Sequence, residues 1–198
     1  MSTVISQQRR RCLRDLSSIA AMALCAPAPT RAHANFGPVE PRLALPEVQV
    51  IAMDGASTAL KSVLAGHVTA LQLMYTGCSA TCPIQGAMFA RLQQQLALAR
   101  CPVRLVSVSI DPRGDDLKAM RAWLLKHGAQ PAMWTGILPQ EAGVDRLQEV
   151  LKGRSQGADR HTPQVYVIDR QARLMYRSED LPSADALFRL LVALNDRA

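Results

Sequence analysis

Aromatic residues are scarce in this chain of 198 residues, since Phe, Trp and Tyr together make up only 4%. Residues 35–198 also lack a basic block, because they carry 18 basic and 15 acidic side chains. A nucleic-acid-binding protein needs a basic surface and often uses aromatic rings that stack on bases, so the composition argues against nucleic acid as a partner. No apolar run reaches the ~20 residues of a membrane-spanning helix. The hydrophobic content of 48% and charged content of 20% instead indicate a globular protein with one core.

Positive charge is concentrated at the N-terminus, where residues 1–34 contain five arginines and one acid. Arginines 9–11 and Arg14 precede a short apolar stretch, 16–28, and Ala32-His33-Ala34 matches the A-x-A pattern of a signal cleavage site. We interpret residues 1–34 as an export signal, of either the twin-arginine or the ordinary secretory type. A third alternative is an uncleaved N-terminal segment that anchors the protein to a membrane. Each of the three alternatives predicts that residues 35–198 lie in the periplasm.

Cysteine is also rare, with five residues, of which Cys12 and Cys25 fall within the predicted signal. Cys78, Cys82 and Cys101 then remain in an oxidising compartment, where disulfides persist. Three is an odd number, which argues against a disulfide framework and favours one functional pair with one spare thiol. We predict that Cys101 is the spare, a buried and unreactive thiol.

The stretch Cys78-Ser79-Ala80-Thr81-Cys82-Pro83 joins an apolar run, 68–75, to a helix-like run, 83–99. A helix that begins near Cys82 directs free amide groups and the positive end of its dipole at both sulfurs, which favours the thiolate over the thiol. Thiolates are nucleophiles and ligands for soft metals. The stretch therefore indicates a metal clamp, a redox switch or both, and a purely structural disulfide is the remaining alternative.

Apolar periodicity predicts an α/β protein whose domain is formed by residues 47–198. Residues 35–46 are rich in proline and lack periodicity, so we expect an extended linker there. A hairpin of strands 48–53 and 56–60 opens that domain, and Asp54-Gly55 is its turn. The further predicted strands are 68–74, 103–110, 164–168 and 173–176, and residues 134–136 are a loop. The predicted helices are 83–99, 116–127, 140–151 and 183–194, and Ser183 is the expected cap of the last one. This alternation predicts a central mixed sheet with helices on both faces. Ligands gather at the carboxyl ends of strands in such sheets, and both the cysteine stretch and Asp111 follow predicted strand ends.

Three elements in combination resemble the SCO1/SenC family over residues 48–194: the C-x-x-x-C-P stretch, the turn 109–115 (Ser-Ile-Asp-Pro-Arg-Gly-Asp), and His161 eight residues before Asp169. By itself, His161 is interpreted as a surface loop residue. The resemblance implies a thioredoxin-like fold, a copper site of Cys78, Cys82 and His161, and a role for Asp111 in orienting that site. It also implies a cytochrome c oxidase subunit with a copper centre as the partner that receives copper, together with an upstream copper donor and a thiol reductant.

The sequence departs from the family pattern in three places. Ser79 stands where proline is frequent, and Arg160 precedes His161 where an acid is frequent. Pro163 stands where thioredoxin-like reductases place a cis-proline beside the redox pair. The histidine favours a copper chaperone, which is a binding and delivery protein rather than an enzyme. The proline favours the alternative, a thiol–disulfide oxidoreductase in which Cys78 attacks and Cys82 resolves.

Overall fold

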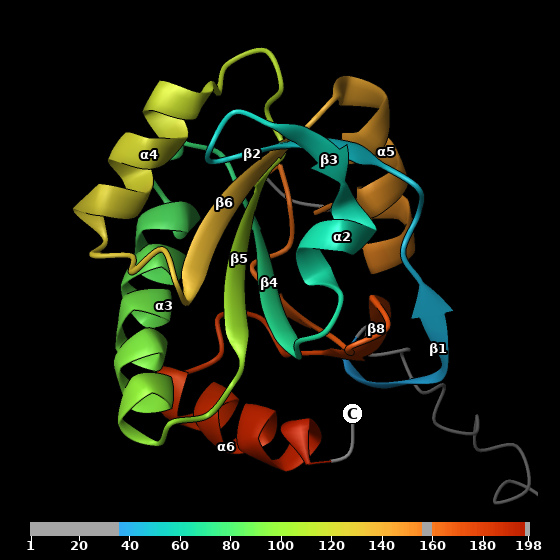
Figure 1. The fold of residues 1–198 in the computed structure, drawn as a ribbon, viewed down its shortest axis with the longest axis vertical. Coiled ribbons are helices and arrows are strands. Elements are labelled where there is room, and N and C mark those ends of the chain that lie inside the picture. Colours follow the sequence, from blue (N-terminus) through green and yellow to red (C-terminus); the bar gives the residue numbers. More distant parts are fainter. Residues whose placement is uncertain (1–35, 156–159, 197–198) are drawn as a thin grey trace, which may run out of the picture. The chain divides into compact units, whose positions relative to one another are not determined.

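The computed structural model describes residues 36–155 and 160–196, so the predicted signal, residues 1–34, lies outside the described residues. Within those ranges, eight strands form one mixed sheet in the order β1-β8-β7-β4-β5-β6-β2-β3 (Figure 1). The strands are β1 (Gly37–Ala44), β2 (Gln49–Ala52), β3 (Ser57–Ala59), β4 (Thr69–Met74), β5 (Arg104–Ser109), β6 (Trp134–Pro139), β7 (Val165–Ile168) and β8 (Arg173–Arg177). No helix in the described part of the chain is long and apolar enough to cross a membrane.

The centre of the sheet is β4, which pairs in parallel with β5 and antiparallel with β7. All six residues of β4 are buried, as a nearly continuous apolar run predicts for a strand covered on both faces. The neighbouring β5 pairs in parallel with β6. The carboxyl ends of β4, β5 and β6 therefore lie at one edge of the sheet, and their following loops can meet there.

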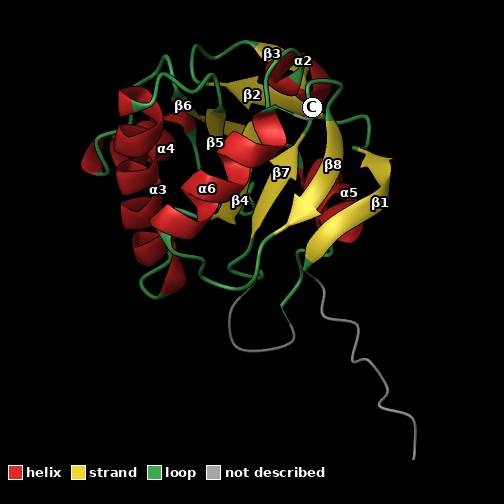
Figure 2. Ribbon diagram, turned by 90° about the horizontal axis from the view of Figure 1, so that it is seen from below, coloured by secondary structure: helices red, strands yellow, loops and turns green. Residues whose placement is uncertain are grey.

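Five helices cover the two faces of the sheet in the described ranges: α2 (Leu60–Leu64), α3 (Thr81–Leu98), α4 (Leu117–Lys126), α5 (Glu141–Leu151) and α6 (Ala184–Asn195). One apolar core lies under α3, α4 and α6, and a second lies under α2 and α5. α3 and α6 lie side by side, and α5 lies on the other face of the strands (Figure 2). Alternate residues of β4 and β5 enter the two cores, which confirms the predicted sheet with helices on both faces.

The predicted hairpin is confirmed, because β2 and β3 pair antiparallel and the Asp54 side chain accepts a hydrogen bond from the Ala56 amide in the turn between them. The predicted cap of the last helix is also present, since the Ser183 hydroxyl accepts from the Ala186 amide at the start of α6. These short-range features follow from local sequence alone.

The segment expected to be a linker, 35–46, contains a strand instead. β1 occupies Gly37–Ala44 and pairs antiparallel with β8, with a shift in register between Pro38 and Leu43. Proline cannot donate a ladder hydrogen bond, which is why its presence argued against a strand. Proline is tolerated on edge strands, and β1 is the edge of this sheet.

The loop expected at 134–136 is also a strand, β6, which lies between β5 and β2. A Cβ atom on Gly136 would lie 2.7 Å from Cγ of Met120 in α4. Glycine at this position therefore permits α4 to pack closely on the sheet, and it does not mark a turn. A smaller correction concerns α3, which begins at Thr81, so Pro83 is the third helical residue rather than the first.

Candidate metal centre

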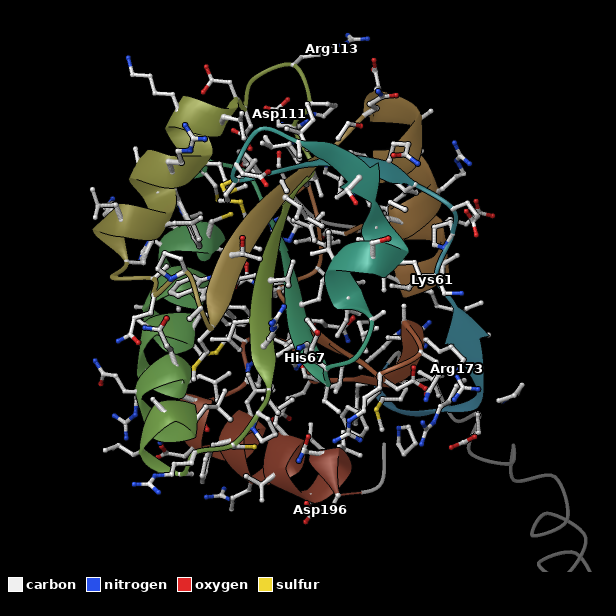
Figure 3. All side chains as sticks on the ribbon, viewed as in Figure 1. Lys61, His67, Asp111, Arg113, Arg173 and Asp196 are labelled. Carbon is white, nitrogen blue, oxygen red and sulfur yellow. The ribbon has the colours of Figure 1, made fainter. Side chains whose placement is uncertain are left out.

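The candidate site lies where loops leave the carboxyl ends of β4 and β5. Cys78 is in the loop between β4 and α3, and Asp111 is in the loop between β5 and α4. Figure 3 shows Asp111 at the end of the sheet where β5 finishes, and His67 at the opposite end, where β4 begins. His67 therefore belongs to the other end of the molecule, as expected from its position before a strand.

The two cysteines meet at the N-terminus of α3. The Cys82 amide donates a hydrogen bond of 3.4 Å to Sγ of Cys78, which satisfies one of the free amide groups at the start of the helix. Cys82 itself lies within the first turn and is fully buried, whereas Cys78 is half-buried in the loop. The two sulfurs therefore differ in access, with Cys78 on the solvent side.

The surroundings of Cys78 lower its pKa although burial alone would raise it. Burial is opposed by hydrogen bonds from the backbone and side chain of Cys82, from the Ala80 amide and from the Tyr75 hydroxyl. Their combined effect holds the pKa of Cys78 below the usual thiol value. Thiolate is the reactive and metal-binding form, so the site favours the state that chemistry at Cys78 requires.

His161 reaches the cysteines from the segment that leads into β7. Its side chain is almost completely buried, and Nε2 lies 3.6 Å from Sγ of Cys82. Nδ1 lies 2.9 Å from the carbonyl oxygen of Thr162, which can only accept, so Nδ1 carries the proton in this contact. In the neutral ring the lone pair is then on Nε2, the atom that faces Cys82. A backbone carbonyl on the second ring nitrogen is the usual arrangement for a histidine that binds a metal.

Tyr75 is a residue of this site that the sequence analysis did not single out. Its hydroxyl donates to Cys78, which is the main reason that the pKa of Tyr75 is raised. Its ring forms a T-shaped contact with His161, with 6.3 Å between the ring centroids and 89° between the planes. Tyr75 therefore contacts two of the predicted ligands, Cys78 through its hydroxyl and His161 through its ring. Its place at the end of an apolar run gave no sign of this role, because a tyrosine there also fits a core position.

Asp111 reaches the site through Arg160. Oδ2 of Asp111 lies 2.9 Å from Nη1 of Arg160, and this hydrogen bond is the main reason that the pKa of Asp111 is lowered. The Arg160 guanidinium also lies over the Tyr75 ring, 4.9 Å from its centroid. Asp111 thus binds Arg160, the residue that precedes His161. The predicted role of Asp111 in orienting the site would therefore act through Arg160.

A second carboxylate, Asp115, supports the loop that carries Cys78. It is buried and accepts hydrogen bonds from the Thr76 amide and hydroxyl and from the Ser109 hydroxyl. These bonds join the end of β4 to the end of β5 just before the cysteine stretch. Asp115 was visible in sequence only as the last residue of a turn, because a carboxylate's partners on other strands cannot be seen from spacing.

The three predicted ligands lie near one another, but their side chains are not arranged to bind a metal ion. Among residues 36–155 and 160–196, no three Cys, His, Asp or Glu side chains are placed to hold a metal ion as they stand. Cys78, Cys82 and Cys101 are not joined in disulfides. Cys101 is half-buried beyond the other end of α3, where burial raises its pKa. The one cis peptide bond in the described ranges precedes Pro41, so the bond before Pro163 is trans.

The SCO1/SenC family model matches residues 49–193 of this chain. The chain belongs to the SCO1/SenC family. Among curated proteins, the SCO1 protein homolog of Bacillus subtilis (strain 168) is 34% identical over 130 residues, which cover 62% of this chain and 66% of that protein. This SCO1/SenC chain thus spans just under two thirds of the length of that relative.

Solved structures confirm the thioredoxin-like fold of this SCO1/SenC protein. The copper-bound ScoI of Bradyrhizobium japonicum matches with a TM-score of 0.61 and 18% identity, over 76% of this chain and 98% of that one. BsSco, described as a member of the Sco family of cytochrome c oxidase assembly proteins with a disulfide switch, matches with a TM-score of 0.65 and 18% identity, over 77% and 93%. At these identities the structures establish the shared fold.

Proposed function

We propose that this protein is a periplasmic copper chaperone that binds one copper ion through Cys78, Cys82 and His161. It would deliver the ion to a cytochrome c oxidase subunit that carries a copper centre. The observation that carries the proposal is the distance of 3.6 Å between Sγ of Cys82 and Nε2 of His161, two buried atoms from distant parts of the chain.

The donor set fits copper in both of its common oxidation states. Two thiolates suit Cu(I), and an imidazole nitrogen adds a ligand that also suits Cu(II). The Thr162 carbonyl holds the ring so that Nε2 faces Sγ of Cys82. Because the three side chains do not yet form a finished site, a rotation of the half-buried Cys78 is the movement we expect on binding.

Family membership and two neighbours support the same proposal. Copper is bound in ScoI of Bradyrhizobium japonicum, and BsSco is described as an oxidase assembly protein. We extend both properties to this chain because residues 49–193 match the family model. The periplasmic location rests on the N-terminal sequence, with its arginines 9–11, short apolar stretch and A-x-A site.

The test is a Cu(I) titration of the reduced chain from which residues 1–34 have been removed. We expect one tightly bound copper per chain, lost in Cys78→Ser and in Cys82→Ser and weakened in His161→Ala. Cys101→Ser is the matched control, because its thiol lies beyond the far end of α3 and should leave copper binding unchanged. Full copper retention in both cysteine variants would remove the proposal.

Delivery needs its own measurement. Copper-loaded protein is mixed with the reduced, copper-free domain of an oxidase subunit that carries a copper centre, and the absorption of the filled centre is followed. We expect faster transfer from the wild type than from a copper-loaded control that lacks the fold, such as a copper–glutathione complex that holds the same free copper concentration. Equal transfer rates from both would mean that the protein only stores copper.

A second function, thiol–disulfide exchange, is supported by the unequal access of the two sulfurs. Cys78 is half-buried with a lowered pKa, and Cys82 lies behind it, as an attacking and a resolving cysteine would. His161→Ala should then leave exchange with a partner disulfide nearly intact while it weakens copper binding. A reduction potential below about −300 mV, the range of inert structural disulfides, would argue against this role.

A further inference from the structure

Three segments of the site meet at the side chain of Arg160. Its guanidinium forms the ion pair with Asp111 from the β5–α4 loop. The same group stacks over Tyr75 from the β4–α3 loop, with Cζ 4.9 Å from the ring centroid. Arg160 is itself the neighbour of His161. One planar cation therefore connects the loop of Cys78, the loop of Asp111 and the segment that carries His161.

Tyr75 connects Arg160 to two of the predicted ligands, His161 and Cys78. Its ring contacts two groups, the guanidinium of Arg160 and the ring of His161, whose plane is nearly perpendicular to its own. Its hydroxyl bonds to Cys78. A change in the position of the Tyr75 ring would therefore alter the packing of His161 directly.

Arginine suits this position better than lysine does. The guanidinium is flat, so one face can stack on a ring while its edge donates to a carboxylate. A lysine ammonium is a compact charge that cannot make both contacts in the same way. A single exposed ion pair contributes little to stability, and Arg160 is half-exposed. Here, however, the ion pair and the stacking both hold the same guanidinium.

The charge of Arg160 is balanced by Asp111 at 2.9 Å. The pair therefore places little net charge beside the sulfurs, and its effect on a bound metal should come through position. Arg160 should therefore act on a bound metal by positioning the ligands and not by its electric field.

We propose that Arg160 is a positioning residue that holds His161 against the two cysteines and thereby sets how strongly the site takes Cu(II) relative to Cu(I). The inference rests on the proposed copper function. Two thiolates can hold Cu(I) without the imidazole, whereas Cu(II) depends more on a nitrogen ligand. Loosening His161 should therefore weaken Cu(II) binding more than Cu(I) binding.

The experiment compares Arg160→Gln and Arg160→Lys with a matched control, Arg154→Gln. Arg154 pairs with Asp145 and lines the same groove of about 400 Å³ as Arg160, so its loss removes the same charge nearby. Affinities for Cu(I) and Cu(II) are measured by competition with chelators. We expect Arg160→Gln to weaken Cu(II) about tenfold and Cu(I) less than about threefold, as is usual when a group behind a ligand is removed. Arg160→Lys should recover part of the loss.

A double-mutant cycle shows whether the effect passes through His161. In the His161→Ala background, Arg160→Gln should cause no further loss of Cu(II) affinity, because the ring that it positions is absent. Electron paramagnetic resonance should show weaker nitrogen coupling to Cu(II) in Arg160→Gln alone. An equal loss in both backgrounds, or the same loss in Arg154→Gln, would overturn the proposal.

A metal-free measurement separates this inference from the copper function. Nuclear magnetic resonance of the reduced protein without copper follows the ring signals of His161, which depend on the nearby Tyr75 ring. We expect these signals to shift or broaden in Arg160→Gln and to stay unchanged in Arg154→Gln. If the wild type binds no copper, the proposed function fails, and unchanged His161 signals in Arg160→Gln overturn the positioning role independently.

Discussion

Sγ of Cys82 lies 3.6 Å from Nε2 of His161, although 79 positions separate the two residues in the chain. Cys82 is held by the first turn of α3, and His161 by the segment that enters β7. Both elements pack against β4, the centre of the sheet, since α3 shares a core with it and β7 pairs with it. The core thus determines the geometry of the site, and variants of its supports test this directly.

Alkylation should distinguish the three thiols of the reduced protein. We expect iodoacetamide to modify Cys78 about tenfold faster than Cys101, with Cys82 slowest, because thiolate character and access control the rate. The pKa of Cys78 is lowered and that of Cys101 is raised, so the rate for Cys78 should rise at lower pH than the rate for Cys101. Mass spectrometry of quenched samples between pH 6 and 10 measures both profiles. Coincident profiles would contradict the hydrogen bonding described for Cys78.

Asp115 and its neighbour Asp116 provide a matched pair of variants. Asp115→Ala leaves the Thr76 amide and two hydroxyls without their acceptor and should lower the free energy of unfolding by about 2–3 kcal/mol. Asp116→Ala removes only the N-cap of α4, bonded to the Ala119 amide, and should cost about 1 kcal/mol. Urea unfolding measures stability, and copper titration below the transition measures the site. We expect weaker copper binding in Asp115→Ala alone, and equal binding in the two variants would show that the Thr76 turn does not support the site.

Gly86 tests the packing between α3 and α4. A Cβ atom there would lie 2.5 Å from Cε1 of His127, whose ring packs against Trp123 and Trp134 and cannot simply move away. Gly86→Ala should therefore destabilise the protein by about 1–3 kcal/mol, the usual cost of overpacking. His127→Ala should be better tolerated in the Gly86→Ala background than in the wild type, because it removes the overlap. Additive losses in urea unfolding would contradict this explanation.

Asp169 should make stability depend on acid pH. Burial alone would raise its pKa, but hydrogen bonds from the Arg173 backbone, from Arg42 and from the Arg173 side chain lower it below the usual value. A carboxyl whose pKa is lower in the folded state stabilises the fold above its unfolded pKa of about 3.9, and this is lost as the pH falls through the folded pKa.

Asp169→Asn should therefore lower the free energy of unfolding by about 2–3 kcal/mol at pH 7 and flatten its decline below pH 4. Asp145→Asn is the control, because its pair with Arg154 is exposed on both sides and should contribute less than about 1 kcal/mol. Unfolding in urea at pH 7, 4 and 3 gives both quantities. Parallel pH curves for Asp169→Asn and the wild type would contradict this account.

Local patterns predicted most of the elements correctly. The apolar run 68–74, the Asp54-Gly55 turn and Ser183 each specify their structure through near neighbours, and the structure confirms β4, the β2–β3 hairpin and the cap of α6. The two strands that were not predicted, β1 and β6, contain proline and glycine. Those residues indicate turns locally, but an edge position and a close helix contact explain them here.

The sequence by itself determined the alternation of strands and helices and the motifs that carry the resemblance to the family, because these depend on residue types at fixed spacings. The three residues predicted to bind copper follow from that resemblance. Only the tertiary structure decided that Nε2 of His161 faces Cys82, that Tyr75 contacts both His161 and Arg160, and that Asp111 reaches the site through that arginine. These contacts join separate loops at one edge of the sheet. Their geometry depends on how β4, β5 and β7 are ordered and packed, which spacing along the chain does not encode.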